Sequence, residues 1–157
     1  MIQKLVSLSK KLVLAERTPS KLAMASSVGI FIAFSPFIGF HWLITIIFAW
    51  LFRLNIGVVY IASHIVNNPL TMIPLYLADY AVGNFLASYF GFNLLPYNPS
   101  WMNWLNLKFS CLSIPNLSLW TFLIGGHILG LLVALIMYPI LIRFYKYMLA
   151  PSMVNKL

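Results

Sequence analysis

Seven polar or ionisable side chains interrupt the apolar stretches of this sequence, and their types are those that bind ions or carry protons. They are His41, Arg53, His64, Asn67, Asn68, Thr71 and Asp79. Ionisable groups inside apolar segments are costly and are usually paired or functional. We therefore treat these seven residues as the candidate lining of a polar pathway.

Asp79 is the only acid outside the N-terminal segment. It could bind a coupling proton or cation. Alternatively, it lies at the headgroup level of a membrane or pairs with Arg53. Arg53 is either an anion partner or a boundary residue whose charge reaches the interface. His41 and His64 have the chemistry to contact a phosphate or to shuttle a proton.

Asn67, Asn68 and Thr71 lie where Pro69 interrupts an apolar run. A broken helix exposes amides and carbonyls that can hold an ion or a phosphate. Alternatively, these side chains only satisfy the backbone groups that Pro69 and Pro74 leave without partners. The sequence leaves both interpretations open.

The sequence argues against catalysis by this chain alone. Its two acids are Glu16 and Asp79, and Glu16 lies in the N-terminal segment, so no paired carboxylates are expected. Cys111 is the single cysteine, and no phosphate-binding loop, dinucleotide fingerprint or zinc motif is present. We therefore expect no enzyme activity, no cofactor and no metal site.

The first apolar unit, residues 22–52, contains no charged residue. It is longer than the roughly 20 residues of one membrane helix and shorter than two such helices. It is interrupted by Ser35, Pro36 and Gly39. Proline removes a backbone donor and clashes with the preceding turn. The pattern predicts a broken helix with arms near 20–34 and 37–52.

A second apolar unit, residues 54–78, repeats this pattern. It is broken at Asn67-Asn68-Pro69 and again at Pro74. Interrupted segments at corresponding positions are typical of membrane proteins with a binding site at the junction. The two units are predicted to be re-entrant or half-helices, and two ordinary kinked helices are the alternative.

Composition indicates a lipid environment. Of 157 residues, 62% are hydrophobic and 8% charged, against about 45–50% and about 25% in soluble domains. The net charge of +8 gathers at the two ends of the chain. This distribution predicts contact with anionic lipid and cytoplasmic termini, and it argues against nucleic acid as a partner.

The segments around these two units, which together span 18–92, have their own signatures. Residues 1–17 predict an amphipathic interfacial helix, and 93–118 an external loop rich in proline and tryptophan. Residues 119–157 predict the last transmembrane helix, ended or bent near Pro139, and a basic tail. Gly126 and Gly130 form a GxxxG face, which suits close helix packing and is one contact for a homo-oligomer.

The ordered series of motifs resembles a known family. The motifs are Thr18-Pro19-Ser20-Lys21-Leu22-Ala23, Ser35-Pro36-x-x-Gly39-x-His41, Arg53-Leu54-Asn55 and Asn68-Pro69-Leu70-Thr71-x-x-Pro74-x-Tyr76. They are similar to those of an uncharacterised bacterial inner-membrane family, the domain of unknown function numbered two thousand and sixty-two. The resemblance implies an inner-membrane location, and fusions of some members to glycosyltransferase domains hint at envelope metabolism. The broken helices also look like those of DedA-type proteins, which are linked to lipid scrambling.

Together, these patterns predict an all-α integral membrane protein of the bacterial inner membrane. It combines Pro-broken re-entrant or half-helices with full transmembrane helices. The leading functional hypothesis is translocation of a solute or a lipid head group through a cleft between the two broken helices. The alternative is a non-transporting adaptor or scaffold for an envelope glycan- or lipid-synthesising enzyme.

Overall fold

The structure is a computed structural model, and it describes residues 18–37, 40–91, 97–103, 107 and 117–150. This part of the chain is helical and contains no strand, which confirms the predicted all-α class. Its elements are α2 (Pro19–Ala33), α3 (His41–Leu51), α4 (Ile56–Val66), α5 (Met72–Phe90), the 3-10 helix η1 (Ser100–Met102) and α7 (Leu119–Met148). The predicted amphipathic segment 1–17 and most of the predicted loop 93–118 lie outside the described residues, as does Gly39.

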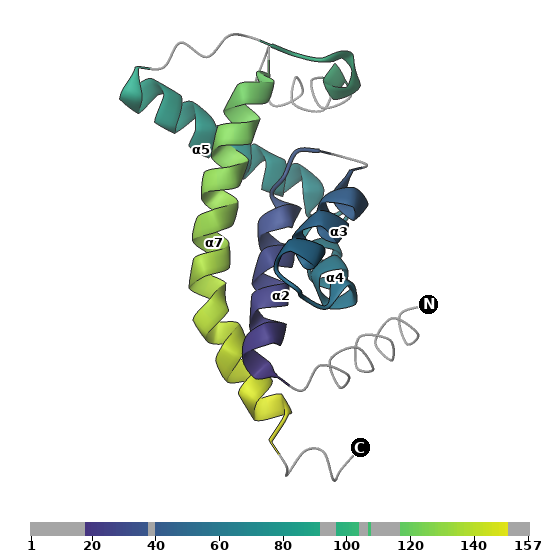
Figure 1. Ribbon diagram of the computed structural model, residues 1–157. Helices are drawn as coiled ribbons and strands as arrows, with labels where there is room; N and C mark the ends of the chain where they lie inside the picture. Colours follow the sequence, from purple (N-terminus) through teal and green to yellow (C-terminus); the bar gives the residue numbers. More distant parts are fainter. Residues whose placement is uncertain (1–17, 38–39, 92–96, 104–106, 108–116, 151–157) are drawn as a thin grey trace.

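α2 lies at the centre of the arrangement (Figure 1). α7 runs along one side of it in the opposite direction, and the α3–α4 hairpin packs on another side. α5 crosses α7 obliquely near the start of α7, at the end of the molecule where α2 stops (Figure 1). The molecule is therefore built around two long contacts of α2, one with α7 and one with α4.

Both predicted helix breaks are present. α2 ends at Ala33 and α3 begins at His41, so Ser35 and Pro36 lie between the two helices. α4 ends at Val66 and α5 begins at Met72. α3 and α4 each contain 11 residues, or about 16 Å at 1.5 Å per residue. Each is therefore about half the length that a bilayer crossing requires.

Pro74 and Pro139 both lie inside helices, and Pro74 differs from the prediction. Pro74 adds no second interruption, because it is the third residue of α5. Proline is tolerated there, since an N–H in the first turn has no acceptor within the helix. Of the two predicted effects of Pro139, an end of the helix is excluded, because α7 continues through it to Met148.

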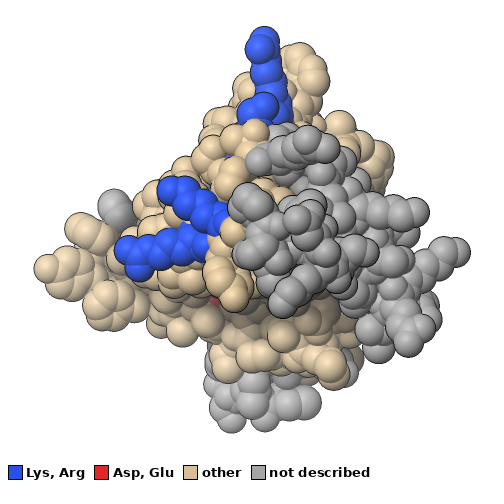
Figure 2. Space-filling model, turned by 90° about the horizontal axis from the view of Figure 1, so that it is seen from below, with Lys and Arg blue, Asp and Glu red and all other residues tan. Residues whose placement is uncertain are grey.

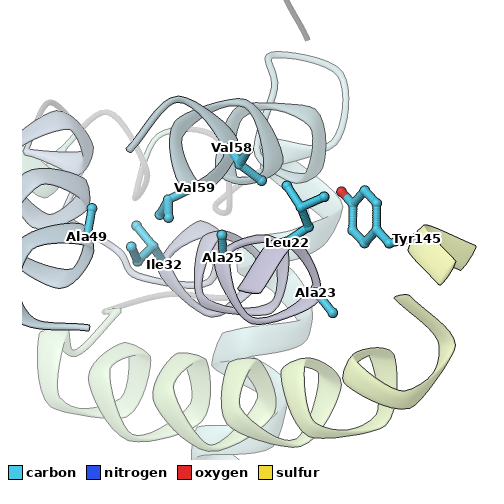
Figure 3. Packing of buried hydrophobic residues seen from close by; sticks show 8 residues of the cluster. All are labelled: Leu22, Ala23, Ala25, Ile32, Ala49, Val58, Val59 and Tyr145. Carbon is cyan, nitrogen blue, oxygen red and sulfur yellow. The ribbon is translucent and has the colours of Figure 1, made fainter. Parts of the chain in front are cut away.

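The main hydrophobic core extends along α2. Leu22 is fully buried and packs among Val58 and Val59 of α4 and Tyr145 of α7 (Figure 3). A second core lies at the other end of the molecule, where Tyr76, Met102, Leu117 and Phe122 meet. Between these two cores lie the helix breaks.

The cations of the described residues gather at one end of the molecule. They are Lys21 at the start of α2, Arg53 in the α3–α4 turn, and Arg143 and Lys146 near the end of α7, and all four are exposed. Figure 2 looks at this end and shows Lys and Arg side chains on its surface. The helix breaks face the opposite direction along α2 and α7 (Figure 1).

Candidate functional site

A pocket of about 160 Å³ lies where the two helix breaks meet. Its lining comes from the start of α3, the end of α4, the α4–α5 turn and the first turns of α5. The lining residues are His41, Ser63, His64, Asn67, Asn68, Pro69, Met72 and Tyr76. The structure therefore has a pocket beside the two breaks, and its lining combines polar side chains with apolar ones such as Pro69 and Met72.

Asn67 holds the walls of this pocket together. Its side-chain amide donates to the carbonyl of Ala33, at 2.9 Å, and to the Tyr76 hydroxyl, at 3.2 Å. Ala33 is the last residue of α2, and Tyr76 is on α5. One side chain at the end of α4 therefore links the ends of three helices.

Two histidines face the pocket from different helices. His41 Nε2 donates to the Ser35 carbonyl, at 3.1 Å, so the imidazole caps the first break. His64 Nδ1 donates to the Tyr60 carbonyl, at 2.9 Å, and its ring packs on the Tyr60 ring with centroids 4.0 Å apart. Each ring is therefore held beside the pocket by a bond to a backbone carbonyl. In a neutral imidazole the other nitrogen is an acceptor.

Asn68 and Thr71 mainly stabilise the α4–α5 turn. The Asn68 side-chain oxygen accepts from the backbone N–H groups of Leu70 and Thr71, at 2.9 and 3.2 Å. The Thr71 hydroxyl donates to the Val66 carbonyl, at 2.6 Å. These bonds match the interpretation in which the side chains satisfy the interrupted backbone. Asn68 still lines the pocket, whereas Thr71 does not.

The first break lies near the middle of α7. Gly130 faces Phe34 just after the end of α2, with Phe34 Cβ 2.9 Å from the position that a Cβ on Gly130 would occupy. Gly130 is also halfway along residues 119–142, the part of α7 without Lys, Arg, Asp or Glu. Because Asn67 is bonded to Ala33, the pocket lies at a similar level.

The GxxxG face is used within the chain. Gly126 and Gly130 both lie against Phe34, and both are buried. The prediction that these glycines allow close helix packing agrees with this geometry. Their proposed role as a contact between two copies does not, because α2 and the following turn already cover this face.

Asp79 is separated from the pocket, whose lining does not include it. It is fully buried on α5, where α5 crosses α7, and its backbone carbonyl lies against Gly125. Neither carboxyl oxygen has a hydrogen-bond partner in the described part of the chain. The structure therefore removes Asp79 from the pocket lining and from the pair with Arg53.

Arg53 also lies away from the pocket. It is exposed in the α3–α4 turn, at the end of the molecule that carries the other described cations. Its φ of 52° is in the left-handed region, which allows the sharp turn between α3 and α4. This position matches the alternative in which Arg53 is a boundary residue.

Sequence reasoning did not identify Ser63 or Tyr76 as pocket residues. Ser63 is buried on α4 and donates to the Tyr60 carbonyl at 2.9 Å. Tyr76 has no exposed surface. Ser63 lies four residues before Asn67 and Tyr76 eight after Asn68, but the sequence does not show which way these side chains point. The one feature of the sequence that pointed to Tyr76 as a pocket residue is its place in the motif that begins at Asn68-Pro69.

A second cavity, of about 500 Å³, lies on the opposite face of α4, between α2, α4 and α7. Its lining is almost entirely apolar. The lining residues are Ser26, Ile30, Val58, Ile61, Ala62, Ile65, Val66, Met137, Leu141, Phe144, Tyr145 and Met148. α4 therefore separates this cavity from the pocket beside the helix breaks.

Comparison with known families gives a match over nearly the whole chain. Residues 3–151 match the family described as an uncharacterized protein conserved in bacteria, DUF2062. The chain belongs to this family. The match includes both helix breaks and the residues that line the pocket between them, so the resemblance seen in the motif series is confirmed. No curated protein and no solved structure matches this DUF2062 chain.

Among the described residues of this DUF2062 protein, one helix is long and apolar enough to cross a membrane. It is α7, whose 30 residues have a mean hydropathy of 2.2 in the most apolar window. α2, α3 and α4 are apolar but shorter. Within the same residues, no group of three or more His, Cys, Asp or Glu side chains is placed to hold a metal ion.

Proposed function

We propose that this DUF2062 protein lies in the bacterial inner membrane and lets a small polar solute or a lipid head group pass through the pocket between its two helix breaks. The observation that carries this proposal is the position of the pocket. It is a recess with polar side chains in its lining at the level of Gly130, halfway along the uncharged part of α7. Irregular backbone at such a depth is tolerated in membranes where it lines a cavity.

The exposed surface of the described helices supports the membrane location. The large exposed apolar side chains of α3 are Trp42, Leu43, Ile46, Ile47, Trp50 and Leu51. Those in the middle and end of α7 are Leu131, Leu132, Leu135, Ile136, Ile140 and Phe144. Such continuous apolar surface is compatible with lipid and would be a large exposed patch in water.

The pocket chemistry favours a neutral polar group. Its described lining supplies imidazole nitrogens, side-chain amides and a tyrosine hydroxyl, and it includes no Lys, Arg, Asp or Glu. A volume of about 160 Å³ suits several water molecules or a small polar group. We therefore expect an uncharged solute, or the uncharged part of a head group, to bind here.

Water access at the pocket provides the first test. A single cysteine at Asn68 or His64, in a Cys111→Ser background, should react with a membrane-impermeant thiol reagent in membranes. Leu132→Cys, exposed on α7 at a similar level, is the matched control and should be shielded by lipid. Equal shielding of the three cysteines would contradict a water-filled pathway.

Flux provides the second test. Purified protein in phosphatidylethanolamine and phosphatidylglycerol vesicles should increase entry of a neutral polyol, or dithionite quenching of a fluorescent phospholipid. Met72→Trp should reduce this flux at least tenfold because Met72 lines the pocket. Ile73→Trp alters the next, exposed residue and should not. Wild-type flux equal to that of empty vesicles would remove the transport proposal, and a stoichiometric envelope enzyme in the purified sample would then favour the adaptor.

A further inference from the structure

Three successive backbone carbonyls at the end of α2 are directed to different partners. The Ala33 carbonyl accepts from Asn67, and the Ser35 carbonyl accepts from His41. The Phe34 carbonyl between them points at α7, where it is the nearest atom to the position that a Cβ on Gly126 would fill. The first break therefore presents a carbonyl oxygen to the α5–α7 crossing.

The carboxyl group of Asp79 reaches the same place from α5. Its Cγ and Oδ2 both lie 3.4 Å from the same Cβ position on Gly126. Asp79 is fully buried, and neither of its carboxyl oxygens has a hydrogen-bond partner among the described residues. Because Gly126 has no side chain, a carbonyl oxygen from the first break and a carboxyl oxygen from α5 approach the same point on α7.

The surrounding charges are unfavourable for a bare carboxylate. The C-terminal end of α2 carries partial negative charge, because its last carbonyls lack partners within the helix. A buried carboxylate beside it would need a compensating positive charge. The described cations cannot supply one, because they are exposed at the other end of the molecule.

Other titratable groups near this point do not provide the charge either. Tyr76 and Tyr80 lie on α5 close to Asp79, and both are phenols. His127 follows Gly126 on α7, but it is exposed, and its Nδ1 donates to the Leu123 carbonyl at 2.7 Å. The turn after α2 contributes Ser35, whose buried hydroxyl has no partner in the described part of the chain.

From this geometry we infer that Asp79 and the Phe34 carbonyl hold a small monovalent cation, either a proton on the carboxyl or Na⁺ between the two oxygens. Unwound carbonyls and the C-terminal ends of half-helices coordinate such ions in membrane transporters. The inference does not depend on the proposed pathway, because ion binding is measured without flux.

Thermal unfolding in detergent tests the inference. The melting temperature of the wild type is measured over a grid of pH and NaCl, with choline chloride keeping the ionic strength constant. A ligand that binds only the folded state raises this temperature by a few degrees when it is in large excess over its Kd. If the ion is Na⁺, the melting temperature of the wild type should change with the NaCl concentration. If the ion is a proton, the melting temperature should change with pH in the absence of Na⁺.

Asp79→Asn should remove whichever response the wild type shows, since an amide is similar in shape and cannot carry the charge. Gly126→Ala should weaken the response, because its Cβ would overlap the Phe34 carbonyl oxygen and displace it from its place beside the carboxyl. Gly130→Ala is the matched control: it crowds Phe34 at the same helix contact but does not approach the carboxyl. Identical responses of the wild type and Asp79→Asn to both pH and Na⁺ would overturn the inference.

Carbodiimide labelling keeps the inference testable if Asp79→Asn does not fold. Dicyclohexylcarbodiimide adds to a protonated buried carboxyl to give an N-acylurea, and mass spectrometry locates the adduct. In the wild type, the yield at Asp79 should fall at least tenfold either with added Na⁺ or with rising pH. A yield at Asp79 that neither Na⁺ nor pH changes would overturn the inference.

Discussion

The side-chain amide of Asn67 donates to the backbone carbonyl of Ala33 at 2.9 Å, although the two residues are 34 positions apart. Ala33 ends α2, and Asn67 follows the last residue of α4. The same nitrogen also donates to the Tyr76 hydroxyl of α5, at 3.2 Å. This one amide therefore sets the relative positions of the two helix breaks that form the pocket.

The first prediction is that Asn67→Ala lowers the free energy of unfolding by about 1–3 kcal/mol, the cost of leaving a buried polar group without its partner. Denaturation in mixed micelles measures this change. Asn84→Ala, at an exposed position on α5, is the matched control and should have little effect. If the two variants are equally stable, Asn67 does not hold the breaks together.

The second prediction concerns the crossing of α5 and α7. A Cβ on Gly83 would overlap the Thr121 carbonyl oxygen, and one on Gly125 would overlap the Asp79 carbonyl oxygen. Backbone cannot move aside as a flexible side chain can. We therefore expect Gly83→Ala and Gly125→Ala each to destabilise the protein by about 1–3 kcal/mol or more. Ser88→Ala, on an exposed face of α5, is the control. Unchanged stability of both glycine variants would show that the helices cross elsewhere.

The sequence predicted the two helix breaks because each proline lies in a long run without charge. Ser35-Pro36 and Asn68-Pro69 both lie between helices. The predicted arms of 20–34 and 37–52 are close to α2 and α3. α2 begins and ends one residue earlier than predicted, and α3 begins four residues later and ends one residue earlier. Pro74 was misplaced because proline breaks a helix interior but is tolerated in the first turn. Sequence alone did not show that α5 starts at Met72.

The candidate site was only partly predictable. His41, His64, Asn67 and Asn68 meet at the pocket, as the positions of the two breaks suggested. Arg53 and Asp79 do not join them, because an isolated charge in a sequence does not reveal which end or face of a helix it occupies. A GxxxG motif likewise indicates close approach without naming the partner, and here the partner of Gly126 and Gly130 is Phe34 of the same chain.

The third prediction fixes the orientation of the protein in the membrane. Lys146 lies at the cationic end, whereas Asn98 lies beside the start of α7, where the Tyr97 carbonyl accepts from Leu119 N–H at 2.8 Å. The excess of positive charge predicts that the cationic end is cytoplasmic.

In intact cells carrying the Cys111→Ser variant, an impermeant maleimide should therefore label Asn98→Cys and leave Lys146→Cys unlabelled until the membrane is opened. The same pattern should hold for Arg53→Cys, since Arg53 lies at the end with Lys146. The reverse labelling pattern would invert the proposed topology. Labelling of both ends in intact cells would contradict a membrane-spanning arrangement.

The fourth prediction tests the contact between α2 and the far end of α7. The hydroxyl groups of Ser26 and Tyr145 form a buried hydrogen bond of 2.8 Å, which requires α7 to continue as a helix beyond Pro139. Tyr145→Phe should lower the free energy of unfolding by about 0.5–1.5 kcal/mol, and Ser26→Ala by a similar amount. Because each single variant leaves the other hydroxyl without its partner, the double variant should cost less than the sum of the two. Additive effects in this double-mutant cycle would mean that the two hydroxyls do not interact and that α7 does not pack on α2 past Pro139.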